Sequence, residues 1–294
     1  MRDETGALAR DRAEADKLRW ADLRLRLVSA LVLAPVAIAV VWLGGTVWIA
    51  LIAVLAIGVA CEWAQLCGSH PASLPGLALL ASMLAIAVAA ARPTAWPALL
   101  VLVAGCALTW VIAMLWPGEP GKRPVSLAAG VIYIGLSAIA LIWLRRDDDA
   151  GLANVLFVLL IVWSSDVGAY AAGRLFGGPR LAPRISPAKT WAGAAGGLLA
   201  AVVVGYVAAV SFAPTAAVVG PSWRIALVAA LLSVMSQLGD LLESFLKRRF
   251  GVKDSGRLIP GHGGLLDRLD GFLAAAPTAA LLAAALGPGV MLWQ

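Results

Sequence analysis

Long uncharged stretches alternate along this chain with short connections that carry glycine, proline and charged residues. The stretch from Leu27 to Cys61 contains no charged residue, and as one helix rising roughly 1.5 Å per residue it would be about 50 Å long. A bilayer hydrocarbon core is only about 30 Å thick, so we expect the chain to turn back at Gly44-Gly45-Thr46. Applied to the whole chain, the pattern predicts nine apolar spans, near residues 27–43, 47–66, 74–91, 97–116, 125–144, 152–175, 191–213, 223–245 and 271–293.

The composition supports a membrane protein. Of the 294 residues, 61% are hydrophobic and 14% are charged, and the mean hydropathy is +0.89. These values exclude a water-soluble globular protein. We therefore expect an all-α fold, a polytopic integral membrane helical bundle of about nine transmembrane helices. Cys61, Cys67 and Cys106 lack metal-ligand or redox spacing and are expected to pack as small apolar residues.

Basic residues are unequally distributed between the two predicted sides of the membrane. Nineteen of the 23 Lys and Arg fall in the N-terminal tail and in the fourth, sixth and eighth connections. The other four are Arg92, Arg145, Arg146 and Arg224. The positive-inside rule places the larger group in the cytoplasm, so nine spans predict a cytoplasmic N-terminus and a C-terminus outside.

The polar segments divide the chain into a charged tail and two membrane regions. These are residues 1–26, 27–144 and 145–294, the last with polar loops at 174–190 and 246–270. The charges of the tail leave no signal-peptide pattern, so we expect the first span to stay in the protein. The first five spans contain almost no ionisable group except Glu62, which lies beside Trp63 at the predicted cytoplasmic boundary. We expect Glu62 to have a structural role, by reaching the interface or by hydrogen bonding.

Span six differs from the earlier spans because it carries an acid in mid-segment. Asp166 and Tyr170 are four residues apart and therefore share a helical face. A carboxylate within hydrocarbon costs several kcal/mol unless it faces a polar cavity, a cation or another helix. We interpret Asp166 as a functional residue, with a hydrogen bond between helices as the alternative.

Span eight ends in a polar stripe. Asp240, Glu243, Ser244 and Lys247 have the spacing i, i+3, i+4 and i+7, which places them on one helical face. The stripe is typical of a ligand-binding surface. A helix end emerging into water, with a Glu243 to Lys247 pair, is the alternative for all but Asp240, which lies one turn deeper.

The connection from 247 to 271 joins basic residues, glycines and acids. Pro260 and the neighbouring glycines precede a helix on which Asp267 and Asp270 share a face. Mg²⁺ takes oxygen ligands, often one or two carboxylates completed by substrate phosphates, whereas zinc would require more nitrogen or sulfur ligands than His262. The basic residues suit a polyphosphate, and glycine lets backbone N–H groups approach it. They are Lys247, Arg248, Arg249, Lys253, Arg257 and Arg268.

The sixth connection supplies further cations. It carries Arg174, Arg180, Arg184 and Lys189. We expect Ser186-Pro187 to form a turn before the next helix, and Lys189 and Thr190 near that helix N-terminus to bind a phosphate. A lysine before a span also serves topology, so this loop alone does not decide the function.

At these residues the sequence resembles the phosphatidate cytidylyltransferase (CDP-diacylglycerol synthase) family. The signature runs from Ser244 through Lys247-Arg248, Lys253-Asp254 and His262-Gly263-Gly264 to Asp267-Arg268 and Asp270. Supporting motifs are "SSDVGAY" around Asp166, "ISPAKTW" around Lys189 and "SQLGDLLES" around Asp240. The likeness covers roughly residues 152–275. Two positions depart from it, Ala192 where the family usually has Glu and Gly178 where a basic residue is common.

The resemblance implies specific roles. Asp240 and Asp267 are implied as the main metal ligands, supported by Asp270 and Asp166, and as catalytic residues together with Lys247 and Lys189. The implied substrate-binding residues are Ser186, Thr190, Ser244, Arg248, Lys253, Asp254, His262, Gly263, Gly264, Arg268, Tyr170 and Arg174. The implied cofactor is Mg²⁺, with a second, monovalent cation left open.

The activity that the resemblance implies is transfer of CMP from CTP to phosphatidic acid, giving CDP-diacylglycerol and pyrophosphate. It also implies a homodimer in a bacterial-type inner membrane, with the active site facing the cytoplasm and no nucleic-acid partner. Two alternatives stay open. One is a different CTP-using lipid enzyme, such as a polyprenol kinase, and the other is an ion-coupled transporter that uses Asp166, Asp240 and Glu243 as a relay.

Overall fold

The computed structural model describes residues 35–119, 121–146, 149–213, 221–252, 255–256, 263–287 and 289–294. Apart from one short hairpin and a single β-bridge residue at 263, the regular secondary structure in this part of the chain is helical. Residues 35–43 are helical and end at the expected turn, where Gly44 and Gly45 have φ of 61° and 50°. The elements that follow are α2 (Gly45–Leu66), α3 (Leu74–Ala90), α4 (Trp96–Leu115), α5 (Pro124–Leu144), α6 (Asp149–Phe176), β1 (Arg180–Ala182), β2 (Ser186–Thr190), α7 (Trp191–Phe212), α8 (Ser222–Phe250) and α9 (Leu266–Leu286).

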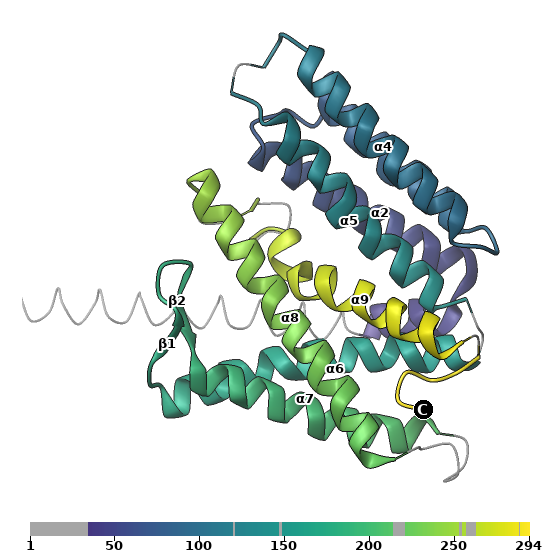
Figure 1. The fold of residues 1–294 in the computed structure, drawn as a ribbon, viewed down its shortest axis with the longest axis vertical. Coiled ribbons are helices and arrows are strands. Elements are labelled where there is room, and N and C mark those ends of the chain that lie inside the picture. Colours follow the sequence, from purple (N-terminus) through teal and green to yellow (C-terminus); the bar gives the residue numbers. More distant parts are fainter. Residues whose placement is uncertain are drawn as a thin grey trace, which may run out of the picture.

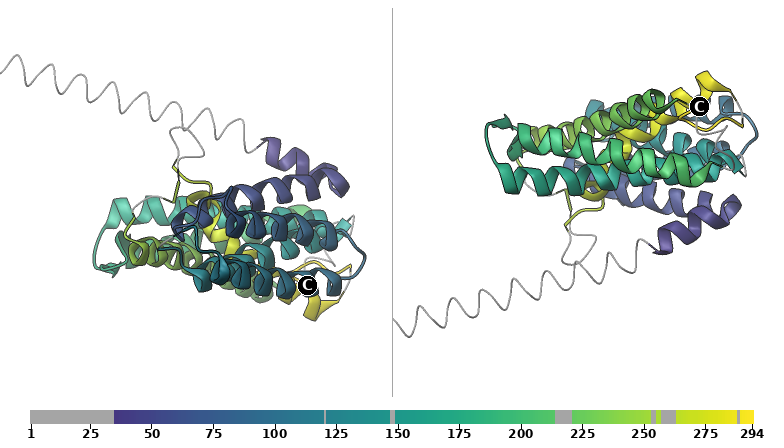
Figure 2. Two further views of the ribbon diagram at one scale, coloured as in Figure 1. Left: turned by 90° about the horizontal axis from the view of Figure 1, so that it is seen from above. Right: turned by 90° about the horizontal axis from the view of Figure 1, so that it is seen from below.

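The helices form two groups that α9 connects (Figure 1). In the first group α3 packs between α2 and α4, and α5 packs against all three. In the second group α6 and α7 form a closely packed pair, which α8 contacts. Figure 2 shows the same bundle from above and below, with the hairpin at one end of the α6 and α7 pair. Because α9 packs on both α8 and α5, it couples the two groups.

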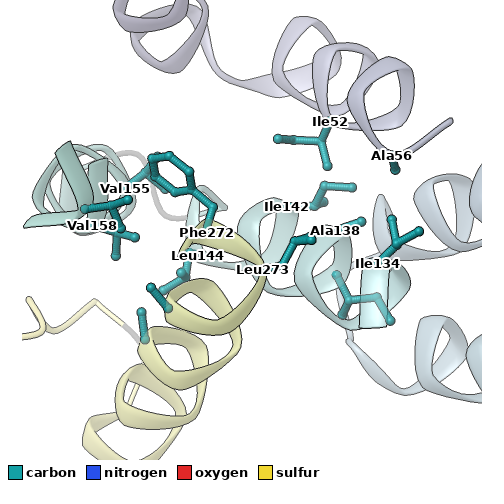
Figure 3. Packing of buried hydrophobic residues seen from close by; sticks show 14 of the residues in the cluster. Ile52, Ala56, Ile134, Ala138, Ile142, Leu144, Val155, Val158, Phe272 and Leu273 are labelled. Atoms are coloured by element: carbon teal, nitrogen blue, oxygen red, sulfur yellow. The ribbon is translucent and has the colours of Figure 1, made fainter. Parts of the chain in front are cut away.

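Buried apolar residues of α9 make this connection (Figure 3). Phe272 and Leu273 lie among side chains of the first group such as Ile142 and Ala138, near Val158 of α6. Lipid is as apolar as these side chains, so close packing and hydrogen bonds hold membrane helices together. Ser137 Oγ supplies such a bond, donating across 2.6 Å to the carbonyl oxygen of Leu273.

Small residues bring α6 and α7 close together. A side chain on residue 168 would place its Cβ 2.5 Å from the Cβ of Ala200, and one on residue 196 would collide with Ala172. Glycine at these positions lets the two backbones approach, as small residues commonly do between membrane helices. The close pair fixes the C-terminal half of α6, where Asp166 and Tyr170 lie.

The two ends of the bundle carry the basic residues that the sequence predicted on opposite sides. Arg123, from the fourth connection, lies over the ring of Phe250 at the end of α8, 4.6 Å from its centroid. At the other end, Arg145 donates to the carbonyl oxygen of Val41 and Arg146 to that of Ala90. The fourth and eighth connections therefore share one end, as the positive-inside count requires.

Seven of the described helices are long and apolar enough to cross a membrane: α2, α4, α5, α6, α7, α8 and α9. At 17 residues α3 is shorter, and the first predicted span is described only from residue 35. The predicted membrane bundle of helices is confirmed, and the count of nine spans stays a prediction. Several helices run beyond their predicted ends, since α8 continues to Phe250 and α9 begins at Leu266.

Of the three cysteines, Cys67 lies in the apolar core and Cys106 packs against it, as the sequence predicted. All three are free thiols, and Cys67 is fully buried in the apolar core. Burial raises the pKa of the Cys67 thiol to about 12, with a smaller opposing effect of Arg123. A thiol with so high a pKa is inert at neutral pH.

Candidate active site

A close crossing of α8 and α9 brings acids of the two helices together. A side chain on residue 239 would place its Cβ 2.5 Å from the carbonyl oxygen of Asp270, and one on residue 271 would place its Cβ 3.4 Å from Asp240 Oδ1. Glycine at both positions permits the contact. As a result, the carboxyl groups of Asp240 and Asp270 lie close to each other.

Two lysines form ion pairs with the acids, and Lys247 bridges two of them. Lys189 Nζ lies 3.0 Å from Asp240 Oδ2. Lys247 Nζ lies 2.6 Å from Asp267 Oδ1 and 2.7 Å from Glu243 Oε2. The predicted pair of Glu243 and Lys247 therefore exists, but it is not a solvated helix end, because the two side chains are only 3% and 14% exposed.

Both carboxylate oxygens of Asp267 have partners. Its Oδ1 accepts from Lys247, and its Oδ2 accepts from the backbone N–H groups of Ser255 and Gly264, at 3.2 and 3.1 Å. Asp267 thus lies in the first turn of α9 and binds the segment that precedes its own helix. An acid in this position also interacts favourably with the helix dipole.

The hairpin of β1 and β2 positions Lys189. The strands are antiparallel, with Arg180 opposite Thr190 and Ala182 opposite Ser186. The predicted turn at Ser186-Pro187 is therefore wrong, because these residues lie in β2 and the turn precedes them at residues 183–185. Proline is tolerated there because a strand of a two-stranded sheet leaves one edge unpaired.

Thr190 ends the hairpin and begins α7. Its Oγ1 accepts from the N–H of Gly193 across 3.0 Å and so caps the helix. The first turn of α7 contains no acid, so no other residue of that turn supplies the carboxylate that the family resemblance leads one to expect in place of Ala192.

These elements enclose a cavity of about 580 Å³. It lies between α6, the hairpin, the start of α7, α8 and the start of α9, at the end of the bundle that carries the hairpin. Ten of the predicted site residues line it: Asp166, Tyr170, Arg174, Ser186, Lys189, Thr190, Asp240, Asp267, Arg268 and Asp270. The structure thus brings together acidic and basic residues from four predicted segments, which run from span six to the start of span nine.

Known proteins resemble this chain over most of its length. A sequence model of the cytidylyltransferase family matches residues 24–286. The chain belongs to the cytidylyltransferase family. It is similar to the phosphatidate cytidylyltransferase of Brucella suis, with 40% identity over 263 residues, 87% of this chain and 91% of the relative. It is also similar to the enzyme of that name from Bacillus subtilis, with 44% identity over 153 residues, 52% of this chain and 55% of the relative.

Five predicted site residues of this cytidylyltransferase surround the cavity without lining it. Lys247 donates a hydrogen bond to the lining residue Asp267, and the backbone N–H of Gly264 donates to the same carboxylate. Gly263 adopts a φ of 79°, and Ser244 is half-buried. Arg248 is exposed, and its Nε lies 3.4 Å from the carbonyl oxygen of Ile185 in the hairpin turn. Lys253, Asp254 and His262 lie outside the described residues.

Gln237 of this cytidylyltransferase was not among the predicted site residues. It lines the cavity, and its Nε2 donates to the carbonyl oxygen of Ala194 at 3.2 Å, which ties α8 to α7. An amide in the middle of span eight, three residues before Asp240, was the available signal, because a polar side chain there requires a partner.

The acids of the cytidylyltransferase cavity fit a hard divalent cation by their chemistry. The lining acids are Asp166, Asp240, Asp267 and Asp270, and Mg²⁺ prefers oxygen ligands of this kind. Within the described ranges, no three His, Cys, Asp or Glu side chains are gathered closely enough to hold a metal ion unaided. Oxygens of a bound substrate would have to complete the coordination, which is usual for Mg²⁺ in nucleotide sites.

Proposed function

We propose that this chain is a phosphatidate cytidylyltransferase, which transfers CMP from CTP to phosphatidic acid and releases pyrophosphate. The observation that carries the proposal is the cavity, which Lys189 and the carboxylates of Asp240, Asp267 and Asp270 line together, while Lys247 pairs with Asp267 from outside it. The names of relatives that are 40% identical over 87% of the chain support the choice of substrates.

In the proposed reaction a phosphate oxygen of phosphatidic acid attacks the α-phosphorus of CTP. The bond from the α-phosphorus to the bridging oxygen breaks, and pyrophosphate leaves. A phosphate monoester has a second pKa of about 6 and is mostly ionised at neutral pH, so the attack requires no strong general base. The work of the protein is to position two anions against their mutual repulsion.

The cations of the cavity perform that positioning. Lys189 is 29% exposed on its side chain, and it can reach from Asp240 toward a phosphate in the cavity. Arg174 and Arg268 also line the cavity and supply positive charge from α6 and α9. Thr190, at the N-terminus of α7, adds the favourable end of a helix dipole for an anion.

Mg²⁺ is the proposed cofactor. Asp240 and Asp270 would hold it as neighbours, with Asp267 and Asp166 as further oxygen donors on the same cavity. When bound, the ion would neutralise developing charge on the phosphates. A second, monovalent cation remains part of the proposal, since several carboxylates share the cavity.

The proposed setting is an inner membrane of the bacterial type, with the cavity at the cytoplasmic side. The basic connections that the positive-inside rule assigns to the cytoplasm lie at the cavity end of the bundle, and Arg123 and Phe250 illustrate this. CTP then enters from the cytoplasm and phosphatidic acid from the adjacent leaflet. A homodimer is also proposed, on the family resemblance alone.

The test is an assay of the purified chain in detergent with phosphatidic acid, Mg²⁺ and labelled CTP. A label on the α-phosphorus should pass into the lipid while pyrophosphate is released. Transfer of a γ-label would instead identify a lipid kinase. Ion or substrate flux in liposomes without pyrophosphate release would identify a transporter, and either result would refute the proposal.

A further inference from the structure

Glu62 makes hydrogen bonds to a part of the chain about 200 positions away. It lies near the end of α2 and is 1% exposed. Its Oε1 accepts from the N–H of Leu265 at 2.8 Å, and its Oε2 accepts from the N–H of Leu266 at 2.8 Å and from Ser255 Oγ at 3.2 Å. The prediction that Glu62 has a hydrogen-bonded structural role is therefore confirmed, and its partners identify what it supports.

The surrounding segment is shaped to admit this carboxylate. A side chain on residue 256 would place its Cβ 2.6 Å from Glu62 Oε1, and one on residue 264 would place its Cβ 2.7 Å from Glu62 Oε2. Only glycine leaves room at both positions. An acid buried to this degree is costly without partners, and the three donors satisfy it.

Glu62 also supplies what α9 itself lacks. The residue that precedes the helix is Leu265, which has no side chain able to cap it, and no cap from its own segment is present. The N–H groups of Leu265 and Leu266 belong to the unsatisfied donors at a helix start. A carboxylate at this end is favoured by the helix dipole, so α2 provides the cap for α9 from another part of the fold.

The segment that Glu62 holds is also the segment that holds Asp267. Ser255 donates its hydroxyl to Glu62 and its backbone N–H to Asp267. Gly264 donates its N–H to Asp267, and the next two N–H groups along the chain go to Glu62. The two carboxylates therefore bind the same short segment, Glu62 from the N-terminal half and Asp267 from α9.

We infer that Glu62 is a positioning residue for the cytidylyl transfer, which acts through Asp267 by fixing the residues that donate to it. The five-helix half of the chain thereby supports the active site, although it contributes none of the predicted catalytic residues and none of the described residues that line the cavity. The kinetic consequence rests on the proposed function, whereas the structural consequence does not.

The first test is the variant Glu62→Gln in the full-length chain. An amide has one acceptor oxygen in place of two, and its NH₂ group faces backbone N–H donors, so at least one donor loses its partner. We expect kcat with CTP and phosphatidic acid to fall about tenfold or more, and half-maximal activity to require more Mg²⁺. Glu62→Asp should not restore activity, because the shorter side chain cannot reach both N–H groups.

The matched control is Ser137→Ala. Ser137 also joins the N-terminal half to α9, through its bond to the carbonyl oxygen of Leu273, but it makes no bond to the segment around Asp267. We expect it to lower thermal stability in detergent without changing the Mg²⁺ requirement. Equal effects of Glu62→Gln and Ser137→Ala on stability and on Mg²⁺ dependence would reduce Glu62 to a general packing residue and overturn the inference.

A second test is independent of activity. Hydrogen exchange of the amides of Gly264, Leu265 and Leu266 should quicken in Glu62→Gln, while exchange around Leu273 stays the same. The milder variant Ser255→Ala removes one donor only, and should produce a smaller change of the same kind even if Glu62→Gln fails to fold. Unchanged exchange in both variants would overturn the inference, whereas a wild-type chain without pyrophosphate release would refute the proposed function alone.

Discussion

Lys189 and Asp240 form an ion pair of 3.0 Å although they lie 51 positions apart in the chain. The hairpin carries Lys189, and α8 carries Asp240, so the pair closes one wall of the cavity between them. Both side chains remain partly exposed, at 29% and 20%. A substrate phosphate can therefore replace Asp240 as the partner of Lys189, and a cation can replace Lys189 as the partner of Asp240. A fully buried pair would not allow either replacement.

The variant Asp240→Asn should abolish activity and leave the protein folded. It preserves size but removes the charge that faces Lys189 and adjoins Asp270. We expect pyrophosphate release to fall about 100-fold or more, as when one preorganised electrostatic contact is lost in other enzymes. Folding is checked by the midpoint of thermal denaturation in detergent.

The control for this variant is Glu119→Gln, the same change of acid to amide in the loop between α4 and α5. Glu119 accepts from the N–H of His70 and from Ser69 Oγ, away from the residues that line the cavity. It should retain activity. Full activity of Asp240→Asn would show that this acid is not needed for the reaction.

The variant Lys189→Gln should weaken the binding of CTP. A charge-assisted hydrogen bond to a phosphate would be lost, and we expect KM for CTP to rise about tenfold or more. Steady-state kinetics at saturating phosphatidic acid measure this directly. Lys122→Gln, in the loop that precedes α5, is the control, because Lys122 donates to the carbonyl oxygen of Trp116 outside the cavity. An unchanged KM in Lys189→Gln would remove this lysine from the binding site.

How far the sequence could predict this site depends on the range of each interaction. The stripe of Asp240, Glu243 and Lys247 follows from helix geometry alone, so its shared face was predictable. The choice of Asp267 as a further partner for Lys247 required the crossing of α8 and α9, which depends on close packing at Gly239. No local pattern specifies such a crossing.

The misassigned turn and the incompletely predicted role of Glu62 have related causes. Ser186-Pro187 has a sequence typical of turns, and only the pairing of Ala182 with Ser186 shows that a strand forms instead. Glu62 stands out in the sequence as an acid within an apolar span, but its partners are separated from it by 193 to 204 positions. Contacts of that range are set by tertiary packing and leave no periodic signal.

The variant Lys247→Met should destabilise the folded protein as well as impair the reaction. It leaves Glu243, whose side chain is 3% exposed, and Asp267 without their shared cation. Removing one partner of a buried ion pair costs about 3 kcal/mol or more, so the thermal midpoint in detergent should fall clearly. Adding Glu243→Gln should recover part of this loss, because one uncompensated charge is removed. An unchanged midpoint in Lys247→Met would contradict the buried pair.

The variant Gly239→Ala should separate Asp240 from Asp270. The new Cβ would lie 2.5 Å from the carbonyl oxygen of Asp270, which belongs to a helix backbone and cannot rotate away, so α8 and α9 must move apart. Overpacking of this kind costs about 1–3 kcal/mol. Gly105→Ala is the matched control, since its Cβ would collide with Ser82 between α4 and α3, two helices, described in full, that contribute no residue to the cavity. Both variants should lose thermal stability, but only Gly239→Ala should lose activity per folded molecule and require more Mg²⁺. If the two variants lose activity equally, the crossing is a general packing contact and does not set the distance between the two carboxylates.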